Sequence, residues 1–163
     1  MTYEHEYYSF SFHDFVRAYC DELDLELVGA LSTTFRSESL KKEVEPNECY
    51  YIQNAKRAIE KNFSTKNYFV PDIAVEIDVT TESLDKYPIY AALEVSEIWI
   101  YDGATVAFYE LEAKNYHQIS SSRALPLLAA EKFAEFLAMS RTKGQTFALK
   151  SFRGWLKEQK QNV

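Results

Sequence analysis

The sequence predicts a single domain of the α/β class, in which strands and helices are mixed along the chain. The length of 163 residues suits one domain with a sizeable core, and 47% of the residues are hydrophobic against 26% charged, as in globular proteins. Hydrophobic residues recur with a helical period near both ends and with a strand period between them. No repeat and no Gly-, Ser- or Pro-rich linker interrupts the sequence, so residues 1–163 are predicted to form one domain.

In the N-terminal third of the sequence, the pattern of residues predicts one helix followed by short strands. From Tyr8 to Leu23, apolar residues recur at the spacing of a helix with one buried face. Segments rich in Leu, Val, Thr, Phe and Tyr then predict strands, and polar segments predict the connections. The predicted strands are 25–28, 30–35 and 48–53, with a charged connection at 38–43 and a polar loop containing a short helix at 54–68.

The clearest strand signal follows Pro71, where acidic and apolar residues alternate over residues 72–79. Pro88 fits only the first turn of a helix, so the next helix is expected to start within residues 83–85 and to run to Leu93. The rest of the chain predicts a hairpin, one more strand and two helices. The hairpin is predicted at 98–101 and 106–111, with Asp102-Gly103 at its turn. The strand is predicted at 116–119, and the helices at 131–139 and 152–159.

Composition excludes several classes of protein. No apolar run approaches the ~20 residues of a membrane span, and the first residues lack the layout of a signal peptide. Cys20 and Cys49 fit no zinc or redox spacing, and we expect buried apolar side chains in a reducing, cytoplasmic compartment. The four glycines form no phosphate-binding loop. The net charge of −7 argues against indiscriminate nucleic-acid binding, although metal-binding carboxylates would contribute to that charge.

One predicted strand carries the strongest chemical signal. Side chains alternate across a strand, so Asp72, Glu76 and Asp78 share one face, and Glu76 and Asp78 lie about 6–7 Å apart. Three carboxylates on one face of a strand suit a site for Mg²⁺ or a similar cation. The alternation of acidic and apolar residues by itself, however, favours an edge strand whose polar face is solvated. Lys86 follows after a short turn, with Tyr90 one helical turn further on. A lysine beside metal-bound carboxylates can stabilise a reacting phosphate or orient water. The position of Lys86 therefore adds support for an active site over a solvated edge strand.

Five segments together resemble a known protein family. They are PNECYYI at residues 46–52, PDIAVEID at 71–78, LDK at 84–86, IYAAL at 89–93 and VSEIW at 95–99. The sequence is similar to the Uma-two family of restriction endonuclease-like proteins with a PD-(D/E)XK-type site, and the resemblance covers most of the chain. It implies a mixed β-sheet flanked by helices. It also implies metal-dependent hydrolysis of phosphodiester bonds in nucleic acid, with DNA as the expected substrate.

The resemblance also implies the residues of the site. The family pattern places a first metal carboxylate in the strand that contains Asn47, a second at Glu76, and a lysine on the following helix at Lys86. Asp72 matches the family's second Pro-Asp pair and has a direct or a supporting role. The implied cofactor is Mg²⁺ or Mn²⁺. The candidate catalytic residues are therefore Lys86, Glu76 and Asp72, and the candidate metal ligands are Glu76, Asp72, Asp78, Asn47 and Glu48.

Three departures from the family pattern bear on this expectation. Asn47 replaces an aspartate, and an amide is a poorer ligand than a carboxylate for a hard divalent cation. Glu48 points to the opposite strand face unless a bulge turns it, whereas Glu45 shares the face of Asn47. Glu94 replaces the glycine of a helix-ending turn. Finally, the helix and hairpin that relatives carry at the N-terminus are missing, so we expect an exposed sheet edge and a homodimer or larger oligomer that covers it.

Two functions stay open at the level of the sequence. The first is a metal-dependent nuclease whose activity is impaired by Asn47. The second is a catalytically inactive module that keeps the nuclease fold and serves in binding or assembly. The second function is favoured by Asn47, by the negative net charge of the chain and by the missing N-terminal portion. Calorimetry with magnesium or manganese discriminates the two, because only the nuclease must bind the metal.

Overall fold

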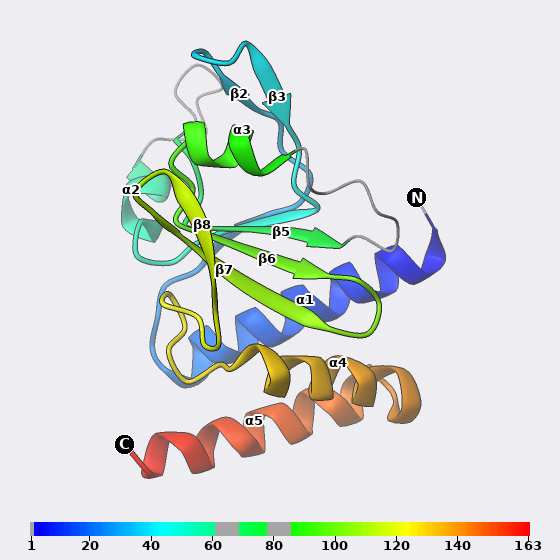
Figure 1. Cartoon of the computed structure of the whole chain (residues 1–163). Helices are drawn as coiled ribbons and strands as arrows, with labels where there is room; N and C mark the ends of the chain where they lie inside the picture. The colour runs from blue at the N-terminus through cyan, green and yellow to red at the C-terminus, as the bar shows by residue number, and fades with distance from the viewer. Residues whose placement is uncertain (1, 61–68, 78–85) are drawn as a thin grey trace.

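The computed structural model of this chain describes residues 2–60, 69–77 and 86–163. It contains a six-stranded sheet, a two-stranded sheet and flanking helices (Figure 1), which confirms the predicted fold class. The helices are α1 (Tyr3–Glu22), α2 (Ala55–Glu60), α3 (Tyr87–Ala92), α4 (Ala130–Lys143) and α5 (Gln145–Gln161). The strands are β1 (Val28–Ala30), β2 (Phe35–Ser37), β3 (Lys42–Val44), β4 (Glu48–Tyr51), β5 (Ile73–Ile77), β6 (Glu97–Tyr101), β7 (Val106–Glu112) and β8 (Asn115–Ile119).

Strand β5 lies in the interior of the large sheet. The order of that sheet is β1-β4-β5-β6-β7-β8, so β5 has β4 on one side and β6 on the other. The β5–β6 pair is parallel, and every other neighbouring pair is antiparallel. Because both edges of β5 are paired and both faces are covered, all five of its residues are buried. The strand is therefore not the solvated edge strand that its alternating acidic residues also fitted.

The two faces of the large sheet carry different helices. Helices α1, α4 and α5 lie together on one side, and α3 with the β2–β3 ribbon lies on the other (Figure 1). Ile73, Val75 and Ile77 of β5 belong to the larger core with α1, α4 and α5. Ala74 belongs to a smaller core with Tyr90 of α3. Successive residues of β5 therefore point to opposite sides, and the alternation places Glu76 on the side of α3.

Several predicted strand boundaries between residues 25 and 44 are wrong. The strand predicted at 25–28 is β1, which begins only at Val28 and ends at Ala30. Residues 30–35 do not form one strand, because β1 ends at Ala30 and β2 begins at Phe35. The predicted charged connection at 38–43 contains the start of β3, which pairs with β2 through Phe35↔Val44 and its neighbours. Lys42 and Glu43 are exposed in this ribbon. A strand with only one buried side chain gives no alternation strong enough to distinguish it from a loop.

The helix boundaries differ for local reasons. The predicted start of the next helix, within residues 83–85, falls outside the described residues; helix α3 is described from Tyr87, and Pro88 occupies its first turn as expected. Helices α4 and α5 are longer than predicted and are separated by Gly144, whose φ of 97° is unfavourable for other residues. The β6–β7 hairpin is confirmed, but its connection spans residues 102–105. It is not a two-residue turn, because the Asp102 carboxylate accepts hydrogen bonds from the backbone N–H groups of Ala104 and Thr105.

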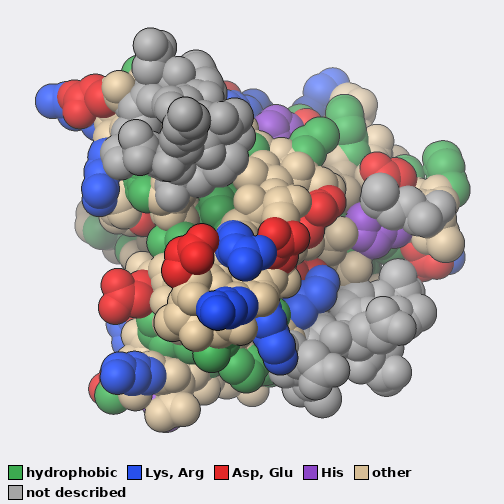
Figure 2. Space-filling model, turned by 90° about the horizontal axis from the view of Figure 1, so that it is seen from above, with side chains coloured by type: hydrophobic (Ala, Val, Ile, Leu, Met, Phe, Trp, Pro, Cys, Tyr) green, Lys and Arg blue, Asp and Glu red, His purple; other side chains and the backbone are tan. Residues whose placement is uncertain are grey.

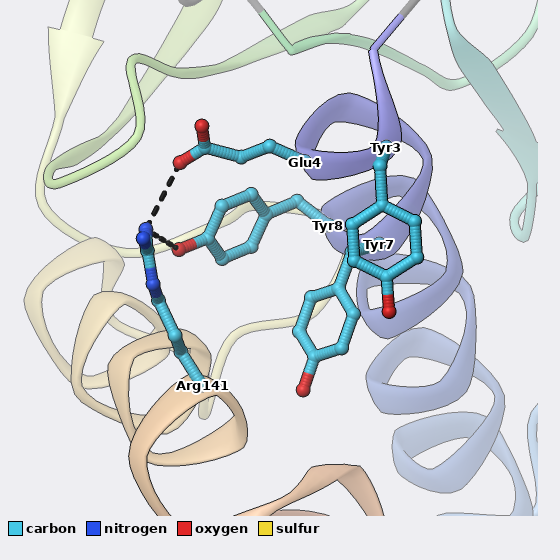
Figure 3. A pocket seen from close by; sticks show the side chains of 5 residues that line it. All are labelled: Tyr3, Glu4, Tyr7, Tyr8 and Arg141. Atoms are coloured by element: carbon cyan, nitrogen blue, oxygen red, sulfur yellow. Dashed lines mark hydrogen bonds and ion pairs between the residues drawn. The ribbon is translucent and has the colours of Figure 1, made fainter.

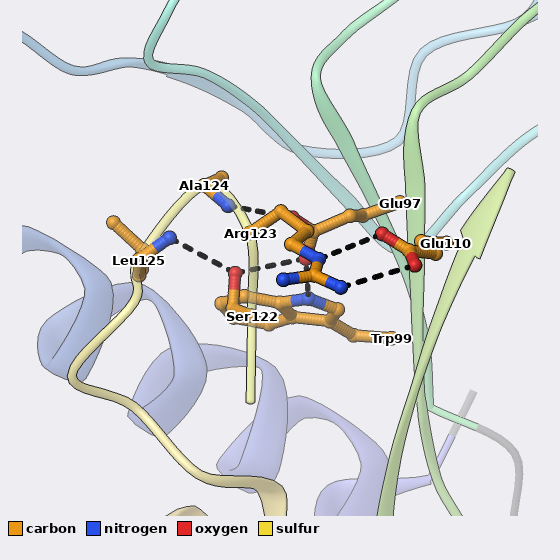
Figure 4. A network of polar contacts seen from close by, with 7 residues as sticks. All are labelled: Glu97, Trp99, Glu110, Ser122, Arg123, Ala124 and Leu125. Atoms are coloured by element: carbon orange, nitrogen blue, oxygen red, sulfur yellow. Dashed lines mark hydrogen bonds and ion pairs between the residues drawn. The ribbon is translucent and has the colours of Figure 1, made fainter. Parts of the chain in front are cut away.

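A buried carboxylate on β6 holds the segment between β8 and α4. Glu97 accepts hydrogen bonds from the indole of Trp99, the hydroxyl of Ser122 and the backbone N–H of Ala124 (Figure 4). The Arg123 guanidinium points instead to Glu110 at the surface. Neutral donors therefore satisfy Glu97, and its contacts indicate a structural role.

None of the helices in the described part of the chain combines the length and the apolar character that crossing a bilayer requires.

Candidate active site

The carboxylate of Glu76 is the centre of the candidate site. Its side chain is only 4% exposed, and its Oε2 accepts a hydrogen bond from the Lys86 Nζ at 2.9 Å. Its Oε1 accepts a hydrogen bond from the Tyr90 hydroxyl. Residues four apart lie on the same side of a helix, so Lys86 at the N-cap of α3 and Tyr90 within it reach the same carboxylate. Strand β5 and helix α3 thus bring together a buried anion, a cation and a neutral donor.

Glu76 differs from the other buried acidic residues in the kind of group that balances the charge of its carboxylate. Within residues 2–60, 69–77 and 86–163, four carboxylate side chains are buried, and Glu76 alone among them forms an ion pair with a lysine or arginine. The other three accept hydrogen bonds from neutral donors; they are Glu48, Asp72 and Glu97. Burying a charge is costly, and a neutral hydrogen-bond network suffices where the role is structural. The Lys86 side chain is 36% exposed, so the ion pair extends from the buried strand towards solvent.

Tyr90 is a hydrogen-bond donor to Glu76 throughout the ordinary pH range. Burial raises the pKa of Tyr90 far above its usual value, and the neighbouring negative charge of Glu76 raises it further. The hydroxyl therefore stays protonated and donates to the carboxylate.

Asn47 lies beside Glu76 on the neighbouring chain segment. Its backbone N–H donates to the carbonyl of Val75 at 2.9 Å, and its Oδ1 accepts from the backbone N–H of Ile77 at 2.6 Å. These two bonds flank Glu76 along β5. The structure therefore brings together Asn47, Glu76 and Lys86, the three positions that the family resemblance implied.

The other predicted site residues have different surroundings. Asp72 accepts from the backbone N–H groups of Ile52 and Asn54 and from the Asn54 amide, so it fixes the segment after β4. Glu48 accepts from Ser9 of α1 and from Tyr50, on the sheet face opposite Glu76. In the described part of the chain no three Asp, Glu, His or Cys side chains converge as a metal site would require. The prediction for Asp78 falls outside the described residues.

Glu45 was a further candidate for reaching the site from the Asn47 face. It is exposed and accepts a hydrogen bond from the Thr34 hydroxyl at 3.1 Å.

Several partners in these networks gave no signal in the sequence. Ser9 is far from Glu48 along the chain, and Ser122 is far from Glu97. Serine is common on protein surfaces, so only the three-dimensional packing shows that these two hydroxyls satisfy buried acids. Tyr90 is different, because its position four residues after Lys86 already indicated a shared helix side.

Two surface features lie outside the candidate site. A cavity of about 220 Å³ between α1 and α4 is lined by aromatic side chains and an ion pair (Figure 3), and its residues are Tyr3, Glu4, Tyr7, Tyr8 and Arg141. Arg141 is already bonded to Glu4 and to the Tyr8 hydroxyl. On the face that includes the β2–β3 ribbon, acidic and basic side chains are interleaved (Figure 2).

Comparison with known proteins identifies the family. The family model Uma2, described as "Putative restriction endonuclease", matches residues 1–142, and the chain belongs to this family. No match was found among curated proteins.

The surroundings of Glu48 predict how stability depends on pH. Burial raises the pKa of Glu48 from 4.5 to about 7, although hydrogen bonds from Ser9 and Tyr50 oppose the shift. As pH rises from about 4.5 to 7, the unfolded chain releases this proton before the folded chain does, so the free energy of unfolding falls, by about 3 kcal/mol at most. In Glu48→Gln this fall should be absent. Urea denaturation in metal-free buffer at several pH values tests it, and equal pH slopes for the two proteins would refute it.

Proposed function

We propose that this protein is a metal-dependent nuclease that hydrolyses phosphodiester bonds of nucleic acid, with DNA as the substrate, in the cytoplasm. The observation that carries the proposal is the buried Glu76–Lys86 ion pair on β5 and α3, beside Asn47. Membership in a family of restriction endonuclease-like proteins supports the reaction class. A buried carboxylate next to a partly exposed lysine is the kind of arrangement that phosphoryl chemistry requires.

The residues around Glu76 fit a hard divalent cation in the chemistry of their ligand atoms. Glu76 and Asn47 both offer oxygen atoms, which Mg²⁺ and Mn²⁺ prefer. Magnesium is commonly held by one or two carboxylates together with waters and substrate phosphates. Glu76 would supply one such carboxylate, and a substrate phosphate and waters would supply further oxygen ligands. We therefore propose Mg²⁺ or Mn²⁺ as the cofactor, with Glu76 as its principal ligand and Asn47 as a weaker one.

Each residue of the site has a distinct proposed role. When bound, the cation supplies Lewis-acid activation of water and neutralises charge on the phosphate. Glu76 binds that cation, and the Asn47 amide oxygen lies on its flank. Lys86 donates hydrogen bonds from a positive charge, so it can orient the attacking water or offset the negative charge that develops on the phosphate. Asp72 supports the site indirectly, by fixing the chain that leaves β4.

A second candidate function is a catalytically inactive module of the same fold that serves in binding or assembly. Two contacts favour it: Lys86 already balances the charge of Glu76, and the Asn47 Oδ1 is already bonded to the Ile77 N–H. In this alternative the ion pair only stabilises the packing of α3 on the sheet. The variants below discriminate the two functions.

Glu76→Gln should abolish cation binding and nuclease activity while the protein stays folded. The change keeps the size of the side chain but removes the only carboxylate that the described site offers. Plasmid cleavage and calorimetry with Mn²⁺ measure the two effects, and circular dichroism monitors the fold. Glu48→Gln is the matched control, because it removes a buried carboxylate that also accepts from a tyrosine but lies on the other face. Cleavage by Glu76→Gln at the wild-type rate would rule out the assignment.

Asn47→Asp should strengthen cation binding, on the order of tenfold, and raise the activity. One carboxylate oxygen can keep the bond from the Ile77 N–H while the other adds negative charge beside the cation, where attraction is large. Calorimetry with Mn²⁺ measures the affinity. Asn115→Asp, at an exposed position on β8, is the control for a change in net charge alone. Unchanged affinity in Asn47→Asp would mean that residue 47 does not face the cation.

We also propose that the protein is a homodimer, in which two sites act on the two strands of a duplex. The described part of the large sheet has β1 and β8 at its edges, and unpaired edges favour pairing with another chain. Light scattering at micromolar concentration and moderate salt should give twice the single-chain mass of 19.0 kDa. A mass near that of one chain would contradict the dimer.

A further inference from the structure

Helix α3 supplies two donors of different charge to one carboxylate. The Lys86 ammonium binds Oε2 of Glu76, and the Tyr90 hydroxyl binds Oε1. Lys86 is partly exposed, whereas Tyr90 is buried. The lysine can therefore swing into solvent on its long side chain, and the tyrosine ring, packed in the smaller core, cannot.

The two donors respond differently to a divalent cation at Glu76. An ammonium group and a divalent cation repel each other at short range, so they compete for the same carboxylate. A neutral hydroxyl is not repelled in this way, and its bond to one oxygen leaves the remaining lone pairs of the carboxylate available. Groups that hold a metal ligand in place commonly change metal affinity when they are removed.

Given the proposed function, we infer that Lys86 and Tyr90 have opposite effects on cation binding. Tyr90 is a positioning residue that holds the Glu76 carboxylate in the orientation that binds the cation. Lys86 is an internal counter-ion, which neutralises Glu76 in the free protein and is displaced when the cation arrives. Once displaced, the ammonium group would be free to offset negative charge on a bound phosphate. The helix thus couples arrival of the metal to release of the lysine.

A second tyrosine–glutamate pair in the same sheet provides a control from the protein itself. Tyr50 donates to the buried Glu48 on the opposite face, and there the other donor is the neutral hydroxyl of Ser9. Tyr50→Phe therefore removes the same type of bond as Tyr90→Phe, from a carboxylate that forms no ion pair with a lysine in the part of the chain that the structure describes. Any general effect of losing a buried tyrosine hydroxyl should appear equally in both variants.

The test is a Mn²⁺ titration, followed by electron paramagnetic resonance, of the full chain and three variants in the absence of nucleic acid. Tyr90→Phe should weaken Mn²⁺ binding by about tenfold or more, the range found for residues that orient metal ligands. Lys86→Met should instead tighten it by about fivefold or more, because the competing charge is gone. Tyr50→Phe should stay within about twofold of wild type. Lys86→Met should also lose cleavage, although it binds Mn²⁺ more tightly.

The outcomes separate this inference from the proposed function. If the wild type binds no Mn²⁺, the proposed function fails, and the inference fails with it. If the wild type binds Mn²⁺ but Lys86→Met binds it no more tightly, only the inference is overturned. Wild-type affinity in Tyr90→Phe, or an equal loss in Tyr50→Phe, also overturns it. Circular dichroism reports the fold, and if Tyr90→Phe does not fold, the direction of change in Lys86→Met decides the question.

Discussion

The burial of one negative charge, on Glu76, sets the requirements for this part of the molecule. The side chain lies on the central strand β5, under α3, where water cannot solvate it. A carboxylate in that position needs compensation, and Lys86 and Tyr90 provide it from the same helix. The packing of α3 on the sheet, the order of strands around β5 and the chemistry of the site therefore depend on one another.

The comparison among buried acids explains why Glu76 is the functional candidate. Glu97 and Asp72 each join a loop to the sheet through neutral donors, and such fully satisfied networks fix a local structure. Glu48 does the same between β4 and α1. The pairing of Glu76 with the partly exposed ammonium group of Lys86 is different, because a charged partner takes the place of neutral donors alone.

The sequence predicted the fold class from the mixed pattern of helices and strands, and the resemblance to the family supplied the candidate site residues, which stay a prediction. The alternation after Pro71 predicted the strand, and Pro88 predicted the helix that follows it. Alternation alone favoured a solvated edge strand, however, whereas β5 is fully buried between two neighbouring strands. The face of Glu48, opposite to that of Glu76, follows from the period of two along a strand. The β2–β3 ribbon was missed because its charged residues hide the alternation. Alternation also suggested one acidic cluster, whereas Asp72 turns to the segment after β4 and accepts hydrogen bonds from the backbone N–H groups of Ile52 and Asn54.

The central claim is that the cation binds at Glu76 and displaces Lys86. Crystals soaked in Mn²⁺ and measured at a wavelength with strong anomalous scattering test it directly. We predict an anomalous peak within about 2.0–2.5 Å of a Glu76 carboxylate oxygen, with Asn47 on its flank, the Lys86 Nζ moved away and the Tyr90 bond retained. A peak elsewhere, or an intact Lys86–Glu76 ion pair at saturating Mn²⁺, would contradict it.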